Sequence, residues 1–143
     1  MSFGTVLDEG EDLTSPRVID AAGPAAVVLY HASYERGGAA AVDALPGGRA
    51  WREAIEACPE SERHLVIHEG HLIKANPRDQ PHVADLIPFA SSMALTGTAE
   101  QVSEKIAGLA ALGVTELAYQ PAGSDIEREL RAFASAAGLP SPN

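Results

Sequence analysis

The sequence has little cysteine and few aromatic residues, and both shortages narrow what the protein can be. Cys58 is the single cysteine among 143 residues, which excludes an internal disulfide framework and a cysteine-rich zinc site. We expect its side chain to pack as a small apolar core residue. Aromatic residues make up 5% of the chain, whereas 45% of the chain is hydrophobic. The core should therefore consist mainly of Ala, Val, Leu and Ile.

Cationic residues are also scarce. The chain has 10 Lys and Arg against 20 Asp and Glu, which gives a formal net charge of -10. Such a surface repels nucleic-acid phosphates and anionic lipids, and no basic cluster offers a local exception. We therefore expect no nucleic-acid partner.

Long hydrophobic runs are missing as well. No apolar run approaches the roughly 20 residues that a membrane-spanning helix needs, so no membrane partner is expected. The first residues, Met-Ser-Phe-Gly-Thr, lack the basic region and the apolar core of a signal peptide. We expect a cytoplasmic protein.

The hydrophobic pattern that is present alternates between strand-like and helix-like segments within a length that fits one domain. We expect strands at Phe3–Leu7, His64–Ile67, Met93–Leu95 and Glu116–Gln120. We expect helices from Pro16 to about Glu35, at Arg49–Ala57, at Thr98–Leu112 and from Ser124 onward. Four strand–helix units in succession are typical of an α/β fold with a parallel sheet.

Local signals mark several helix ends. Pro16 follows Thr14-Ser15, as expected for proline at the first helical position. Gly23-Pro24 should kink the first helix and Gly37-Gly38 should end it. Thr98 with Gln101, and Ser124 with Glu127, have the spacing of capping boxes.

Several motifs occur in an order that resembles a known family. The segment Thr96-Gly97-Thr98-Ala99-Glu100-Gln101-Val102 is followed by Gly113-Val114-Thr115-Glu116 and by Gln120-Pro121-Ala122-Gly123. Together with Gly4–Gly10 and His68-Glu69-Gly70-His71, they resemble the C-terminal half of the luciferase-like monooxygenases, a family of flavin- and deazaflavin-dependent oxidoreductases.

That resemblance implies a half TIM barrel. The family fold is an eight-stranded barrel, and residues 1–138 would form one half-barrel domain containing strands five to eight, with 139–143 as a flexible tail. An open half-barrel exposes two sheet edges. We therefore expect a homodimer or a complementary half-barrel chain as partner. A natural half-length protein and a fragment of a longer one both remain open.

The resemblance also implies a cofactor site. Phosphate groups often bind TIM barrels after strands seven and eight, at a helix N-terminus. Thr96, Gly97 and Thr98 would hold the phosphate of FMN or of the deazaflavin coenzyme F-420, and Gln120 and Gly123 would belong to the same site. The alternative for residues 96–98 is a capped turn without a ligand.

His68, Glu69 and His71 are the candidate catalytic residues, because they would line the mouth of the barrel. A histidine there could bond a substrate or the flavin ring and titrate near neutral pH; a purely structural histidine is the alternative. We expect no metal site here, since positions i and i+3 of a strand point to opposite faces. The segment also lacks the helical His-Glu-x-x-His spacing.

An acidic loop follows the first expected strand, at Asp8, Glu9 and Glu11. These carboxylates could act in acid/base chemistry, or they could form a solvated loop. The function predicted from all these features is a flavin- or deazaflavin-dependent oxidoreductase of the luciferase-like type. The alternatives are a non-catalytic half-barrel that binds a flavin, another small molecule or a partner, and a purely structural oligomer.

Overall fold

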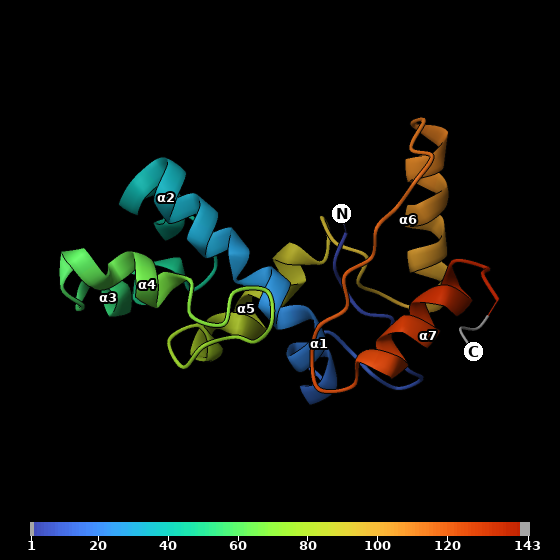
Figure 1. Cartoon of the computed structure of the whole chain (residues 1–143), viewed down its shortest axis with the longest axis horizontal. Coiled ribbons are helices and arrows are strands. Elements are labelled where there is room, and N and C mark those ends of the chain that lie inside the picture. The colour runs from blue at the N-terminus through green and yellow to red at the C-terminus, as the bar shows by residue number, and fades with distance from the viewer. Residues whose placement is uncertain (1, 141–143) are drawn as a thin grey trace.

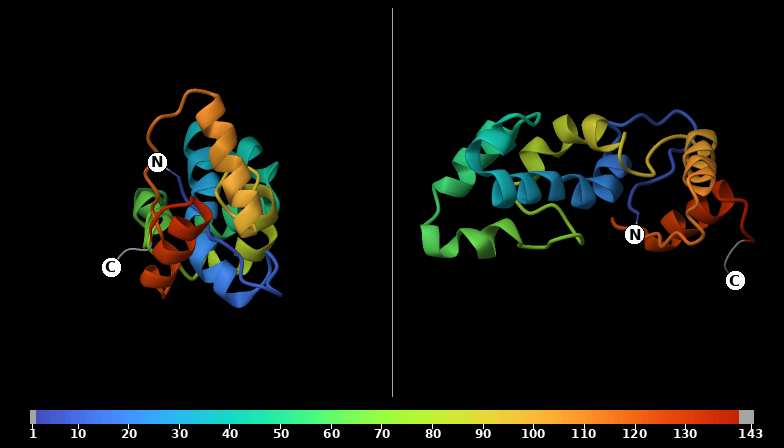
Figure 2. Two further views of the ribbon diagram at one scale, coloured as in Figure 1. Left: turned by 90° about the vertical axis from the view of Figure 1, so that its right-hand side faces the viewer. Right: turned by 90° about the horizontal axis from the view of Figure 1, so that it is seen from above.

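A computed structural model describes residues 2–140 and shows a helical chain with no sheet within that range (Figure 1). Two hydrophobic clusters organise it into two units at opposite ends of an elongated molecule (Figure 2). The helical elements are α1 (Pro16–Ala26), α2 (Val28–Asp43), α3 (Gly48–Glu56), the 3₁₀ helix η1 (Glu60–Glu62), α4 (Arg63–Ile67), α5 (Gln80–Ala90), α6 (Ala99–Ala111) and α7 (Ile126–Ala136).

The central unit, residues 16–90, contains α1 to α5 and the larger hydrophobic cluster. Helix α1 packs on α5, and α2 packs on α3. The two helices α1 and α5 approach so closely that a Cβ at Gly23 would lie 2.7 Å from a methyl carbon of Val83. The core combines such close helix contacts with two large aromatic groups, Trp51 and Tyr30, which are both fully buried.

Glycine and proline divide the first helices. Pro24 lies inside α1, and α2 starts two residues after α1 ends. The predicted helix is thus divided at Val27, three residues after Pro24, where a kink or a division was expected. Gly37-Gly38 ends the first helical run as expected, because Gly38, with φ 66°, has a non-helical backbone. A second helical run follows directly and continues to Asp43, and the two runs together make up α2. Only glycine adopts such a φ at little cost.

The terminal unit, residues 2–15 and 91–140, brings the two ends of the chain together. The first segment runs between two others, and Ser2 N donates to Ala118 O (2.7 Å) while Leu95 N donates to Phe3 O (2.7 Å). The pairing is parallel but amounts to two isolated bridges, Ser2 with Tyr119 and Val6 with Gly97. Helices α6 and α7 pack beside these segments.

The predicted α/β half TIM barrel is wrong. His64–Ile67, expected as a strand, forms α4, and Met93–Leu95 lies in a run of turns. Phe3–Leu7 and Glu116–Gln120 are extended segments that pair only at single bridges. Helical turns satisfy backbone groups locally, so the middle of the chain has no strand to add to the parallel segments. Because there is no half-barrel, the reason for expecting a partner that closes a barrel no longer applies.

Helix prediction was more accurate in the terminal unit. Thr98 and Gln101 form the expected capping box at the start of α6. The cap of α7 is Asp125 rather than Ser124, and its carboxylate accepts a hydrogen bond from Arg128 N (3.0 Å). Of the expected flexible tail 139–143, the last three residues lie outside the described range, while Leu139 N donates to Ala134 O (2.8 Å).

A buried ionic network joins the two units. Glu129 on α7 is 2% exposed. It accepts hydrogen bonds from Thr5 Oγ1 (2.6 Å) and from Arg17 Nη1 (2.7 Å) of α1. Arg128 reaches the same carboxylate and also donates to Val6 O (2.7 Å). Hydrogen bonds from this many donors offset the free energy that the Glu129 carboxylate loses when it is removed from water.

Candidate metal centre

Three histidines meet in the central unit. His31 lies on α2 and is 2% exposed. His68 follows directly after α4, and His71 lies in the turn that comes next. One ring nitrogen of each histidine lies within 4.8 Å of those of the other two. The cluster thus connects α2 to the end of α4.

The separations between the rings match those of ligands on one metal ion. His31 Nδ1 lies 3.2 Å from His71 Nδ1, and His68 Nδ1 lies 3.4 Å from the same atom. Two nitrogens bound tetrahedrally to zinc at about 2.0–2.1 Å are roughly 3.3–3.4 Å apart. Two of the three nitrogen pairs therefore already have the spacing of adjacent tetrahedral ligands, and the third pair lies within 4.8 Å.

Carboxylates on the outer side of two rings determine where their protons sit. His68 Nε2 lies 2.6 Å from Glu35 Oε1, and His31 Nε2 lies 3.6 Å from Asp79 Oδ2. A neutral imidazole carries one N–H, and a nearby carboxylate favours that proton on the nitrogen facing it. The inner Nδ1 atoms of His31 and His68 then present lone pairs toward His71 Nδ1.

Asp79 is held in place by the aromatic core. Its Oδ1 accepts a hydrogen bond from Trp51 Nε1 (2.7 Å), and its backbone N–H donates to Asn76 Oδ1 (3.0 Å). Trp51 also stacks on the His31 ring, with centroids 5.8 Å apart. Within the described residues, Asp79 Oδ2 and His31 Nε2 are buried without a hydrogen-bond partner. These two atoms face each other and need to approach by only a few tenths of an ångström to bond.

The environment keeps His71 neutral. Burial lowers the pKa of His71 below its ordinary value of 6.5, and the neighbouring His31 and His68 lower it further, against the opposing effect of Glu35 and Asp79. Neutral imidazole is the form that binds metals. At neutral pH the cluster therefore has a free lone pair to offer a cation.

The structure corrects the reason for expecting no metal here. On a strand, His68 and His71 would point to opposite faces, but α4 and the following turn bring their ring nitrogens together. Glu69, predicted beside them, is separate: its carboxylate lies 3.6 Å from Arg78 Nη1. Sequence reasoning missed His31, Glu35 and Asp79. The four-residue spacing of His31 and Glu35 on one helix was the available signal for the first two.

The residues predicted to bind a flavin lie at two places in the terminal unit. Thr98 caps α6, and both backbone polar groups of Gly97 pair with the first segment, to Thr5 O (3.3 Å) and from Leu7 N (2.9 Å). Gln120 N donates to Ser2 O (2.9 Å). Gly123 lies against α1, where an added Cβ would be 3.0 Å from Ala21 Cα.

The surroundings of the α6 N-terminus are acidic. Glu11, Asp12 and Glu104 line the same hollow as residues 96–98. Lys105 lies there too, but its ammonium donates to the carbonyl oxygens of Ser91, Ala94 and Thr96. Carboxylates that line the same hollow as a helix N-terminus repel a phosphate group and oppose its binding there.

The acidic loop after the first segment is part of the ionic network. Glu11 pairs with Arg17, and Asp8 Oδ1 lies 2.5 Å from Arg128 Nη2. Hydrogen bonding from Arg17 lowers the pKa of Glu11, against the opposing effect of burial. Each of these two carboxylates thus has an arginine partner within the network.

No family model, curated protein or solved structure matches this chain. The resemblance to luciferase-like monooxygenases stays a prediction. Among the described residues, no helix combines the length and the apolar character that crossing a membrane requires.

Proposed function

We propose that this protein binds a zinc ion through His31, His68 and His71. The proposal rests on the convergence of three ring nitrogens. In two of the rings, the other nitrogen, Nε2, lies near a carboxylate. Zinc sites repeatedly combine imidazole ligands with carboxylates that hold the second ring nitrogen. The same donor set also suits other first-row transition metals, but not Mg²⁺ or Ca²⁺, which prefer oxygen ligands.

The proposed ion would join two segments that are far apart in sequence. His31 comes from the first turn of α2, whereas His68 and His71 follow α4. Because the unfolded chain has no such arrangement, binding free energy would stabilise the central unit. The protein supplies three ligands and leaves a fourth coordination position on the metal. That position would be accessible to solvent, because the His68 side chain is 41% exposed.

Titration of the metal-free protein with Zn²⁺ tests the proposal. We expect 1:1 binding by calorimetry, and Co²⁺ should give the intense visible bands of a tetrahedral complex. Mg²⁺ should not compete. His68→Ala removes one ligand and should weaken Zn²⁺ binding by more than about 100-fold, beyond the usual 10- to 100-fold loss for an outer carboxylate.

His64→Ala is the matched control. His64 lies on α4, one turn before His68, and is exposed and outside the cluster. Its removal should leave Zn²⁺ affinity unchanged. Glu35→Gln, at an exposed position, should weaken binding by roughly 10-fold. Equal affinity in the unaltered protein and in His68→Ala would rule out the site.

Three histidines and an open position are also the ligand set of catalytic zinc, whose bound water ionises near pH 7. Hydrolysis of 4-nitrophenyl acetate by the zinc-loaded protein, compared with His68→Ala, separates a catalytic site from a structural one. Activity equal in the two proteins would indicate that zinc has only a structural role.

The flavin-dependent oxidoreductase predicted from the family resemblance stays a separate prediction, as do its cofactor, FMN or F-420, the homodimer and a cytoplasmic location. A flavin absorption band that remains with the purified protein would support the cofactor. Loss of that band on Thr98→Ala, with α6 still folded, would place it at residues 96–98.

A further inference from the structure

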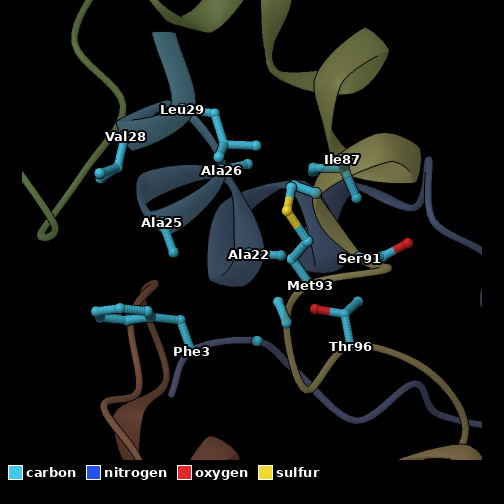
Figure 3. Close-up of a pocket in the computed structure, with 13 residues that line it drawn as sticks. Phe3, Ala22, Ala25, Ala26, Val28, Leu29, Ile87, Ser91, Met93 and Thr96 are labelled. Atoms are coloured by element: carbon cyan, nitrogen blue, oxygen red, sulfur yellow. The ribbon is translucent and has the colours of Figure 1, made fainter. Parts of the chain in front are cut away.

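An apolar cavity lies where the two units meet. It is bounded by α1 and the start of α2 on one side, by α5 on another, and by the segments around Phe3 and Met93 below (Figure 3). Its volume is about 220 Å³. The histidine cluster is not part of its lining.

The lining excludes charged ligands. Ala22, Ala25 and Ala26 form the α1 wall, and their small side chains create the space. Leu29, Ile87 and Phe3 supply the larger apolar surfaces. None of the described residues that line the cavity carries a charge, so a phosphate or carboxylate would lose its hydration without compensation there.

One polar group in the lining has no protein partner. Thr96 is 4% exposed, and within residues 2–140 its hydroxyl makes no hydrogen bond, although its carbonyl oxygen accepts one from Lys105. Figure 3 shows this hydroxyl directed toward the cavity. The Ser91 hydroxyl, by contrast, donates to Pro88 O (2.9 Å). The hydroxyl oxygen is not among the fully buried atoms that lack a partner. It is therefore accessible from the cavity and free to bond to a ligand oxygen there.

We infer that the cavity binds a small, neutral, largely hydrocarbon molecule with one hydroxyl or carbonyl oxygen, which bonds to Thr96. An apolar cavity of about 150 Å³ in a protein accommodates benzene, so a cavity of 220 Å³ has room for a substituted benzene. The apolar body would contact the α1 wall, and the oxygen would face Thr96. This site is independent of the proposed zinc site.

Two matched probes test the inference: 4-ethylphenol, and 4-ethyltoluene, which replaces the hydroxyl with a methyl group. Calorimetry should show saturable 1:1 binding of both, with methyl NMR shifts at Ala22, Ala25 and Thr96. Thr96→Val keeps the shape and removes the hydroxyl. It should weaken 4-ethylphenol binding by about 2- to 10-fold, the value of one hydrogen bond, and leave 4-ethyltoluene binding unchanged.

Ala25→Leu fills the cavity from a partly exposed position and should abolish binding of both probes. Ala107→Leu makes the same change at an exposed position of α6 and should bind both normally. His68→Ala should also bind both, which distinguishes this site from the zinc site. Failure of the unaltered protein to bind either probe, or full binding by Ala25→Leu with its circular dichroism intact, would overturn the inference.

Discussion

The central and terminal units are built on different physical principles. The central unit surrounds Trp51 and Tyr30, both fully buried, with helices, and its buried polar side chains His31, Asn76 and Asp79 lie in one cluster. The terminal unit is held by backbone pairing between extended segments and by the Glu129 network, with a smaller apolar cluster around Val102 and Phe133. Several of its large apolar side chains are exposed, Leu112 at 84%. Packing thus dominates one unit and polar bonding the other.

The largest expected effect breaks the aromatic core of the central unit. Trp51→Ala removes the stack on Tyr30, with centroids 5.3 Å apart, and the hydrogen bond to Asp79. We expect a loss of about 3–5 kcal/mol in the free energy of unfolding, measured by urea denaturation with circular dichroism. A loss below about 1 kcal/mol would mean that packing does not dominate this unit.

The corresponding test in the terminal unit removes a charge. Glu129→Gln leaves Arg17 and Arg128 without the full charge that they share. We expect a loss of roughly 3 kcal/mol, with faster hydrogen exchange at the amides of residues 95–97, 2–7 and 118–120.

Glu127→Gln is the control on the same helix. The Glu127 side chain is 75% exposed, and its ion pair among the residues that the structure describes is with Arg131, so the change should cost less than about 0.5 kcal/mol. Equal losses for the two variants would show that the buried network has no special role.

Zinc should stabilise the two units unequally. At a free concentration 100 times its dissociation constant, Zn²⁺ should add about 2.7 kcal/mol to the free energy of unfolding, with hydrogen-exchange protection concentrated in residues 16–90.

The pKa of His71 is lowered from 6.5 in the folded state, so the unfolded state binds its proton first as pH falls. Stability and zinc affinity should both be highest above pH 6.5 and decrease below it. Equal stabilisation by Zn²⁺ at pH 5 and pH 7.5 would contradict this.

The smallest effect concerns the acidic loop. Glu11→Gln removes one charge from a partly exposed pair with Arg17 and should cost about 1 kcal/mol at pH 7. Because the folded-state pKa of Glu11 lies below its ordinary value of 4.5, its contribution is present above pH 4.5 and is lost as pH falls through the folded-state pKa. The stability curves of the two proteins should therefore converge in acid. A constant difference down to pH 2 would assign the effect to something other than ionisation.

Prediction from sequence succeeded where local chemistry decides the structure. Pro16 starts α1 and the Thr98–Gln101 box starts α6, because these residues satisfy or remove backbone donors within one turn of chain. Prediction failed at His64–Ile67, whose β-branched and apolar residues are typical of a buried strand. There Ile67 is buried in the central core as part of a helix, and no neighbouring strand is available to pair with it.

The candidate site shows the same division. His68 and His71 could be selected from the sequence, but their relation to each other depended on whether the segment was a strand or a helix. His31 and Asp79 are 48 residues apart in the numbering, and no local pattern marks Asp79 or connects it to His31.

The sequence by itself determined the acidic charge, the exclusion of a disulfide framework, and the positions of the best capped helices, because composition and short-range hydrogen bonding need no folded context. Only the tertiary structure decided that the chain forms no barrel within residues 2–140, that three histidines converge, and that Thr96 faces an apolar cavity. Those outcomes depend on which helices pack together, and packing joins residues that are distant in the chain.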